Sequence, residues 1–98
     1  MNLDELWSVV RGIPPGFVTS YGDVGRALHN PATGYQVGRW MAQCPAEVPW
    51  WRVVSKDGLL PVGKRDPKLA KEQLDRLTEE GVSVVEGQID MAQHLFIP

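Results

Sequence analysis

The stretch T-S-Y-G-D-V-G-R-A-L-H-N-P-A-T-G-Y-Q-V-G-R-W-M, residues 19–41, decides the fold. It holds two helix-capping patterns, in each of which a hydroxyl residue precedes an acid or amide by three positions: Ser20 with Asp23, and Thr33 with Gln36. Such pairs mark the first turn of a helix. Pro31 closes the first helix, because proline cannot continue one. Two short helices joined by a tight turn predict a helix-turn-helix motif.

The flanking segments add a helix before this motif and a hairpin after it. Asn2 and Glu5 have capping-box spacing and precede apolar positions at 3, 6, 7 and 10, and the prolines after Gly12 end that helix. Downstream, R-V-V-S at 52–55 is typical of a strand, K-D-G at 56–58 of a hairpin turn, and Leu59-Leu60 of a returning strand. A hairpin after a helix-turn-helix is a wing.

The C-terminal third predicts one longer helix and a strand. Asp66-Pro67 caps the helix and Gly81 follows its end, while its apolar side consists of Leu69, Leu74 and Leu77. Residues 82–85 are typical of a strand. Residues 94–98 are ambiguous, and a short strand is one alternative for them. We therefore expect a mainly α fold with a small β wing, a single winged helix-turn-helix-like domain over residues 1–98.

Composition favours a folded domain whose charge is unevenly spread. The chain has 98 residues, 43% hydrophobic content and a formal net charge of −2. Eight basic residues against three acidic ones fall within residues 26–71, whereas both flanking regions are net acidic. This middle region forms either one positive face toward phosphates or an ordinary mixed surface. The start M-N-L-D-E-L is unlike a signal peptide, and no apolar run is long enough for a membrane span.

Familiar catalytic and metal patterns are absent from the sequence. His29 and His94 are far apart and, with the one cysteine, make no metal-ligand set; we expect surface or capping roles for both. We expect no metal and no cofactor. Glu79-Glu80 is predicted to be a solvated pair, because adjacent helix positions do not converge. Cys44 is predicted to be structural, because no neighbouring His or Lys would lower its pKa.

Five segments, taken in order, resemble one family. They are I-P-P-G-F-V-T-S-Y-G-D-V at 13–24, Asn30-Pro31, Q-V-G-R-W-M at 36–41, P-W-W-R-V-V-S-K-D-G at 49–58, and E-E-G-V at 79–82. Their order and spacing are similar to the DNA-binding domain of O6-alkylguanine-DNA alkyltransferases. In those enzymes the central motif reads P-C-H-R-V, and its cysteine accepts the alkyl group. Trp50 stands at that position here, which resembles the alkyltransferase-like proteins.

The resemblance implies recognition without repair. An indole cannot accept an alkyl group, but its flat apolar face suits an extruded base. We expect a non-enzymatic protein that binds duplex DNA containing O6-alkylguanine through the minor groove and flips the base. Nucleotide excision repair proteins would then read the bound complex. We expect a monomer with no membrane association. We also expect a cytoplasmic location, at the nucleoid in a prokaryote, or a nuclear one in a eukaryote.

The resemblance also assigns candidate residues. The DNA-binding set is Ser20, Tyr21, Tyr35, Gly38 and Arg39. Tyr21 is expected to assist flipping, against the alternative of a packing tyrosine. Gly38 allows close approach either of DNA or of another helix. Arg39 either binds phosphate or is solvated.

The lesion-pocket set is Tyr21, Pro49, Trp50, Arg52, Val53, Val54, Lys64 and Arg65. Trp50 would line the pocket, and Arg52 would either brace it or contact the DNA backbone. Arg65 would probe the face of the flipped base by stacking and cation–π attraction, against the alternative of a surface charge.

Three positions depart from the family pattern. Tyr35 aligns with the arginine that replaces the extruded base in the stack; it can wedge but carries no charge. Trp51 replaces a histidine, and Cys44 stands where asparagine is frequent. On a strand, neighbouring side chains alternate, so we expect Trp50 to face the pocket and Trp51 the core. Two other functions remain open: a winged-helix DNA or protein adaptor without lesion specificity, and an active alkyltransferase using Cys44.

Overall fold

The helix-turn-helix is present and is held by its own caps and by a close backbone contact. It consists of α2 (Tyr21–Ala27) and α3 (Gly34–Met41). Ser20 Oγ accepts from the Asp23 N–H at 3.0 Å, and Thr33 and Gln36 form both bonds of a capping box. In the turn, Gly25 O accepts from the Ala32 N–H at 3.1 Å. The capping patterns therefore predicted both helix starts correctly.

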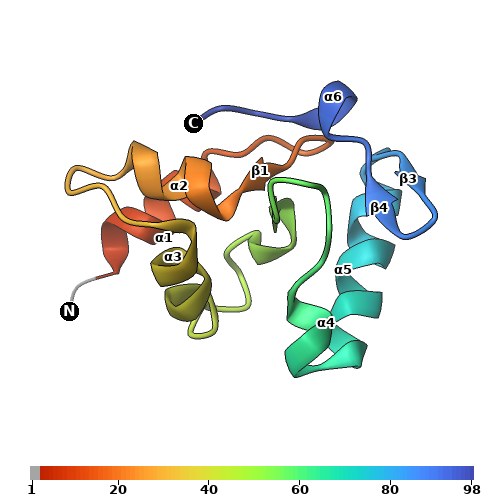
Figure 1. Cartoon of the computed structure of the whole chain (residues 1–98), viewed down its shortest axis with the longest axis horizontal. Helices are drawn as coiled ribbons and strands as arrows, with labels where there is room; N and C mark the ends of the chain where they lie inside the picture. The colour runs from red at the N-terminus through yellow and green to blue at the C-terminus, as the bar shows by residue number, and fades with distance from the viewer. Residues whose placement is uncertain (1–2) are drawn as a thin grey trace.

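The computed structural model describes residues 3–98, and the other elements surround this motif (Figure 1). In chain order they are α1 (Asp4–Arg11), β1 (Thr19–Ser20), the 3-10 turn η1 (Trp50–Arg52), β2 (Val53–Val54), α4 (Val62–Arg65), α5 (Pro67–Glu79), β3 (Val84–Val85), β4 (Gln88–Ile89) and α6 (Met91–His94). Helices α1–α3 lie at one end of the long axis and α4, α5, β3 and β4 at the other. The mainly helical fold with a small sheet is confirmed.

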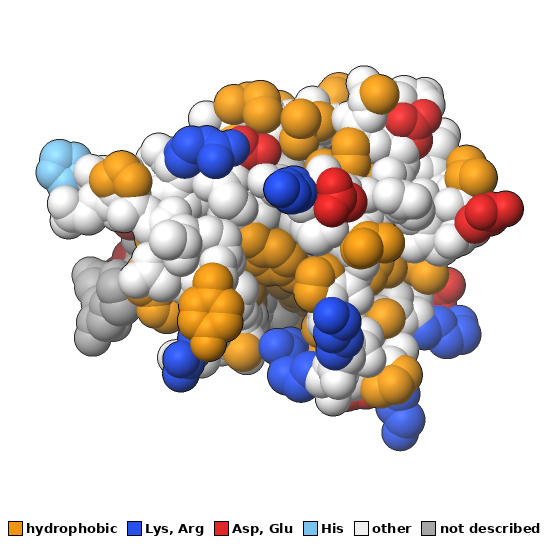
Figure 2. Space-filling view, viewed as in Figure 1, with side chains coloured by type: hydrophobic (Ala, Val, Ile, Leu, Met, Phe, Trp, Pro, Cys, Tyr) orange, Lys and Arg blue, Asp and Glu red, His pale blue; other side chains and the backbone are white. Residues whose placement is uncertain are grey.

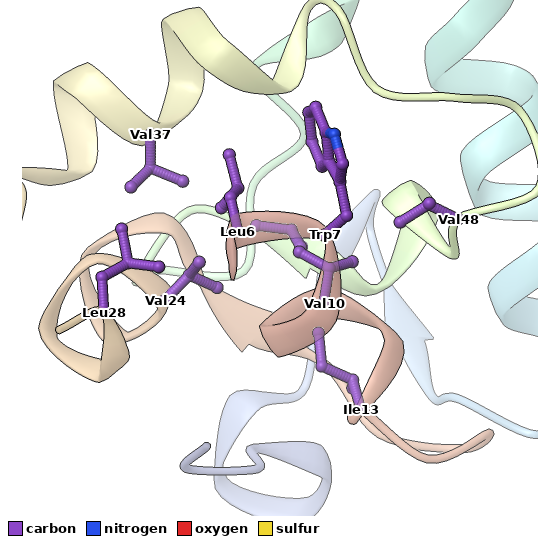
Figure 3. Close-up of a cluster of buried hydrophobic side chains, with 9 residues drawn as sticks. Leu6, Trp7, Val10, Ile13, Val24, Leu28, Val37 and Val48 are labelled. Atoms are coloured by element: carbon purple, nitrogen blue, oxygen red, sulfur yellow. The ribbon is translucent and has the colours of Figure 1, made fainter. Parts of the chain in front are cut away.

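The first hydrophobic core joins α1 to the helix-turn-helix (Figure 3). Leu6, Trp7 and Val10 project from α1, as their spacing predicted, and meet Val24 and Val37. The predicted cap Asn2 lies outside the described residues, and the residue before the helix is Leu3, without a side-chain cap. The Glu5 carboxylate instead accepts from the His29 N–H at 2.9 Å, which ties α1 to the turn after α2.

The predicted wing differs from the observed sheet. The turn at 56–58 forms, with the Ser55 N–H donating to Leu59 O, but the chain then continues into α4 rather than into a returning strand. Strand β2 pairs in parallel with β1, matching Thr19 with Val53 and Ser20 with Val54. Gly58, at φ +80°, packs on β4: its O accepts from the Ile89 N–H, and a Cβ would lie 2.3 Å from Ile89 O. Strand β2 therefore pairs with the distant strand β1 and not with a strand formed by Leu59 and Leu60.

The second core lies against α5, and β2 separates it from the first. Val53 belongs to the α1–α3 core, whereas Val54 packs with Val18, Leu77 and others in the second core. Both valines are fully buried. As predicted, Asp66 caps α5, with its side chain accepting from the Lys68 N–H, and Gly81 follows the helix with φ +86°. Strand β2 thus fixes the two halves of the molecule to each other.

The C-terminal residues complete this second half and correct one expectation. Strands β3 and β4 form a hairpin, and the tail bridges Val18 at Leu95. His94, predicted at the surface or in a cap, is 7% exposed, and its Nε2 accepts from the Ser83 N–H at 2.9 Å. It is buried because the tail folds back over residues 16–18, with the Val18 N–H donating to His94 O. Within residues 3–98, no helix is both long and apolar enough to span a bilayer.

Replacing Gly25 by alanine should destabilise the fold strongly, because the new Cβ would lie 2.0 Å from Ala32 O. We expect the free energy of unfolding to fall by more than about 2 kcal/mol in denaturant titrations. Gly38→Ala is the matched control, since its Cβ would meet nothing within 4 Å. It should raise stability by about 0.5–1 kcal/mol through helix propensity. Equal effects of the two changes would contradict the close contact.

Candidate nucleic-acid interface

A cavity of about 530 Å³ opens between the helix-turn-helix and the α4–α5 half. In Figure 2 a hollow lined with hydrophobic side chains lies in the lower part of the face shown, with Lys and Arg side chains beside it. The cavity is lined by Tyr21, Gly34, Tyr35, Gly38, Arg39, Met41, Ala42, Trp50, Pro61, Val62, Arg65 and Gln73. An apolar cavity with a few polar groups at its edge is the usual form of a small-ligand site.

Six residues selected from the sequence line this cavity. They come from four elements far apart in the chain: Tyr21, Tyr35, Gly38, Arg39, Trp50 and Arg65. The fold therefore brings the start of α2, helix α3, η1 and the end of α4 to one place. Their roles in DNA and base recognition stay predictions.

The remaining selected residues lie elsewhere, for identifiable reasons. Val53 and Val54 are buried in the two cores, and Pro49 is buried ahead of η1. Ser20 is 3% exposed because its hydroxyl caps α2. Lys64 is exposed on α4 but is not among the cavity-lining residues. Arg52 turns away from the cavity toward Glu80. Five of the eight lesion-pocket residues are therefore not among the residues that line the cavity.

Sequence reasoning also missed part of the lining: Gly34, Met41, Ala42, Pro61, Val62 and Gln73. Gln73 had a readable signal. It stands four residues from both Leu69 and Leu77, so it is a polar residue on the apolar side of α5. Only 1% of it is exposed. Buried amides normally hold specific hydrogen bonds, which marks this position for attention.

Gly38 and Tyr35 define the α3 edge of the cavity. Outside its chain neighbours and its own helix backbone, no atom of the described chain lies within 4 Å of a Cβ built on Gly38. Helix packing therefore does not require this glycine, and the open side of α3 faces the cavity. The Tyr35 side chain is exposed (74% for the residue), and the Arg39 guanidinium lies 5.9 Å from its ring centroid. A flat ring and a positive charge thus stand side by side at the rim.

The paired tryptophans do not lie on a strand. Trp50 and Trp51 belong to η1, and their rings meet edge to face at 86° with centroids 6.1 Å apart. Strand alternation was therefore the wrong reason for separating them. Trp50 lines the cavity, and Trp51 packs against the second core. Two guanidinium groups lie over the Trp51 ring, that of Arg76 at 4.5 Å and that of Arg52 at 5.4 Å from its centroid.

A hydrogen-bonded ion pair holds η1 in this position. Arg52 donates to both carboxylate oxygens of Glu80, at 2.6 Å from Nη2 and 3.0 Å from Nε, and Nη1 donates to Ile13 O at 2.9 Å. Glu80 also accepts from Trp51 Nε1 at 2.9 Å and from the Gly16 N–H at 3.3 Å. Arg52 therefore braces the site. Glu80, predicted to be solvated, is partly buried because four N–H donors from Arg52, Trp51 and Gly16 converge on it.

Two groups, Tyr21 in the cavity wall and Cys44 outside the cavity lining, have pKa values raised chiefly by burial. Burial raises the pKa of Tyr21, and the nearby positive charge of Arg65 acts in the opposite direction. Arg65 is therefore close enough to the Tyr21 hydroxyl for its charge to act on that group. Cys44, half-buried against the first core, has a pKa raised to about 11, chiefly by burial. A thiol with such a pKa is a poor nucleophile near neutral pH.

The sequence model for the DNA-binding domain of 6-O-methylguanine DNA methyltransferase matches residues 3–82. The chain belongs to this family. Among curated members it is 36% identical over 93 residues to the DNA base-flipping protein of Escherichia coli K12, covering 92% of this chain and 70% of that protein. It is 37% identical over 91 residues to Alkyltransferase-like protein 1 of Schizosaccharomyces pombe, covering 86% and 82%.

Solved structures extend the comparison to the whole fold of this family. The S. pombe Atl1 structure in complex with damaged DNA containing O6-carboxymethylguanine superposes with a TM-score of 0.82 at 32% identity, covering 100% of both chains. A second S. pombe ATL complex with DNA gives a TM-score of 0.79. The helix-turn-helix, η1 and the α4–α5 half thus follow the arrangement of a family member solved on DNA.

Glu80→Gln should destabilise the protein, because it leaves the partly buried Arg52 without its carboxylate. We expect a loss of about 3 kcal/mol at neutral pH. Burial alone would raise the pKa of Glu80, but the bonds from Arg52, Trp51 and Gly16 lower it below 4.5. Because the pKa of Glu80 is lower in the folded protein than in the unfolded chain, the ionised carboxylate stabilises the fold above pH 4.5. This stabilisation is lost as the pH falls through the pKa that Glu80 has in the folded protein.

The difference in the free energy of unfolding between wild type and Glu80→Gln should therefore become smaller in acid, as measured by urea unfolding across pH 3–7. Glu79→Gln is the control, since Glu79 is exposed on the same helix; it should change stability by less than about 0.5 kcal/mol. A gap that stays constant with pH would show that the ionised pair contributes nothing.

Proposed function

We propose that this protein binds duplex DNA containing O6-alkylguanine and holds the flipped base in the cavity without repairing it. The observation that carries this is the cavity itself. It lies between the helix-turn-helix and α4, is lined by Trp50 and Arg65, and occurs on a fold shared with a relative solved on O6-carboxymethylguanine DNA. A flipped base needs a largely apolar pocket with a few polar contacts.

The α3 edge supplies the DNA contacts in this proposal. The open position at Gly38 lets the backbone of α3 approach the minor groove closely. Tyr35, exposed at the rim, wedges into the stack at the place of the extruded base, and Arg39 beside its ring provides the positive charge toward phosphate. Tyr21, half-buried in the cavity wall, limits the path of the flipped nucleotide.

The side chains around the base explain why the protein would bind the lesion without taking up its alkyl group. By its resemblance to the P-C-H-R-V motif, Trp50 takes the place of the acceptor cysteine, and it offers only an indole face and one N–H. Cys44 is not among the cavity-lining residues, and its raised pKa disfavours the thiolate. A cavity that binds the lesion and cannot react keeps it, so the complex persists as a mark on the DNA. We infer that nucleotide excision repair proteins read this mark, and that a monomer acts in the cytoplasm or, in a eukaryote, the nucleus.

Arg65 is our candidate for reading the lesion. It lies at the end of α4, lines the cavity and acts electrostatically on Tyr21. A guanidinium above a purine gains from stacking and cation–π attraction, both of which depend on the electronic character of the base. This distinguishes lesion recognition from generic adaptor binding, for which Arg65 would contact phosphate only.

Arg65→Ala should reduce the preference for a duplex with one O6-methylguanine over the unmodified duplex by about tenfold, because it removes stacking on the flipped base. Fluorescence anisotropy at fixed salt measures both affinities. Lys64→Ala is the matched control: Lys64 is an exposed cation next to Arg65 but outside the cavity lining, so its loss should weaken binding to both duplexes alike. Equal wild-type affinity for the two duplexes would exclude the proposed function.

Incubation with O6-methylguanine DNA should leave the protein mass unchanged, because neither Trp50 nor the protonated Cys44 thiol accepts a methyl group. Intact-protein mass spectrometry after long incubation provides the measurement. Cys44→Ala, which should bind the lesion as the wild type does, serves as the control for any adduct. A methyl adduct lost in Cys44→Ala would establish an alkyltransferase instead.

A further inference from the structure

The C-terminal tail adds a strand-like segment beside β1. The Val18 N–H donates to His94 O at 2.9 Å, and Val18 O accepts from the Phe96 N–H at 2.8 Å, so the two segments run parallel. Val18 leads directly into β1, whose Thr19 pairs with β2. Successive residues of a strand present their backbone groups to opposite edges. The tail therefore lies along the edge of this strand that β2 leaves free.

The outer side of the tail has an unpaired backbone. Because the Phe96 N–H points to Val18, the N–H of the next residue, Ile97, points the other way. Among residues 3–98 it has no acceptor, and neither Leu95 O nor Ile97 O has a donor. An open edge of this kind is a template for another extended chain, and proteins normally protect it with charge, proline or a bulge. Only Pro98 does so here, and it leaves residues 95–97 open.

The side chains along this edge are apolar and face solvent. Ile97 is 63% exposed and Leu95 is also exposed, whereas Phe96 between them packs against the first core. Phe17, exposed on the neighbouring segment, meets the Phe96 ring edge to face with centroids 6.4 Å apart and extends the apolar surface. Figure 2 shows hydrophobic side chains along the upper border of the molecule, where the tail lies. We call residues 95–97 the tail edge.

Charge and position separate the tail edge from the DNA site. Residues 77–98 contain four acids and no Lys or Arg, and Glu86 and Asp90 among these acids are exposed. Figure 1 places the tail at the top of the view, whereas the cavity lies between α3 and α4 below it. Duplex phosphates require cations, so DNA bound at the cavity leaves the tail edge accessible.

We propose that the tail edge binds an extended segment of a partner protein, which adds a strand beside residues 95–97. The unpaired backbone requires a polypeptide, the exposed Leu95 and Ile97 favour apolar side chains on it, and the acidic surroundings favour lysine or arginine among them. A second copy of this chain paired through the same edge would bring two acidic regions together. The inference goes beyond the proposed function, because the tail edge lies outside the cavity and needs no DNA.

The test uses a defined probe, an acetylated and amidated peptide of six residues in which lysine and valine alternate. Titration of the ¹⁵N-labelled protein should shift the amide signals of Leu95 and Ile97 and slow hydrogen exchange at the Ile97 N–H. The same peptide N-methylated at every internal amide should bind at least about tenfold more weakly, because it cannot donate to the edge. A peptide with glutamate in place of lysine should also bind more weakly.

Ile97→Pro removes the outward donor and keeps the bond from the Phe96 N–H to Val18 O. It should weaken binding of the lysine–valine peptide about tenfold and leave the preference for an O6-methylguanine duplex unchanged. Val85→Thr is the matched control, since Val85 is an exposed apolar residue on β3; it should bind the peptide as the wild type does. If Ile97→Pro folds poorly by circular dichroism, hydrogen exchange at Ile97 in the wild type decides.

The outcomes distinguish this inference from the proposed function. It is overturned if the wild type binds no peptide up to about 1 mM, or if the N-methylated peptide, the glutamate peptide or Ile97→Pro shows no weakening. An equal loss in Val85→Thr would also overturn it. Wild-type dimers that dissociate in Ile97→Pro during sedimentation would assign the edge to a second copy, and a duplex that displaces the peptide would assign it to DNA. Peptide binding without lesion preference would overturn the proposed function alone.

Discussion

The ion pair between Arg52 and Glu80 is the interaction on which the rest of the site depends. It joins three segments that are far apart in the sequence: the loop at 13–16, η1 and the end of α5. A partly buried pair stabilises only when its desolvation is offset by complete hydrogen bonding. Here the carboxylate accepts from Arg52, Trp51 and Gly16, and the guanidinium also reaches Ile13 O, which meets that condition. The position of Trp50 in the cavity follows from it.

A second constraint comes from the two-residue strand β2. Val53 enters one core and Val54 the other, so the strand fixes the helix-turn-helix half relative to the α4–α5 half. The cavity lies between those halves, with α3 on one side and α4 and α5 on the other. Its lining comes from segments separated by up to about half the chain, yet its walls rest on two well-packed cores. Close packing of that kind is how a small domain can hold a preformed binding site.

The comparison with the sequence shows which physical signals are local. Ser20, Thr33 and Asp66 predicted three helix starts, because a cap needs only residues within one turn. The partner of β2 was missed, because the turn at 56–58 is equally compatible with a hairpin and with a turn that leads into α4. Six cavity residues were found through family resemblance. The burial of Glu80 was not, because it depends on partners 28 to 64 residues away. The burial of Gln73 was missed although its spacing from Leu69 and Leu77 indicates it.

The adjacency of Tyr35 and Arg39 at the cavity rim has an evolutionary consequence. In the family pattern one arginine combines a flat, stackable group with a positive charge. Here the two properties belong to separate residues one helical turn apart. In the proposed function, a substitution at Tyr35 changes the strength of intercalation without altering the local charge, and one at Arg39 changes the charge without altering the ring. How long the protein stays on a lesion and how fast it finds DNA could then be adjusted by independent substitutions.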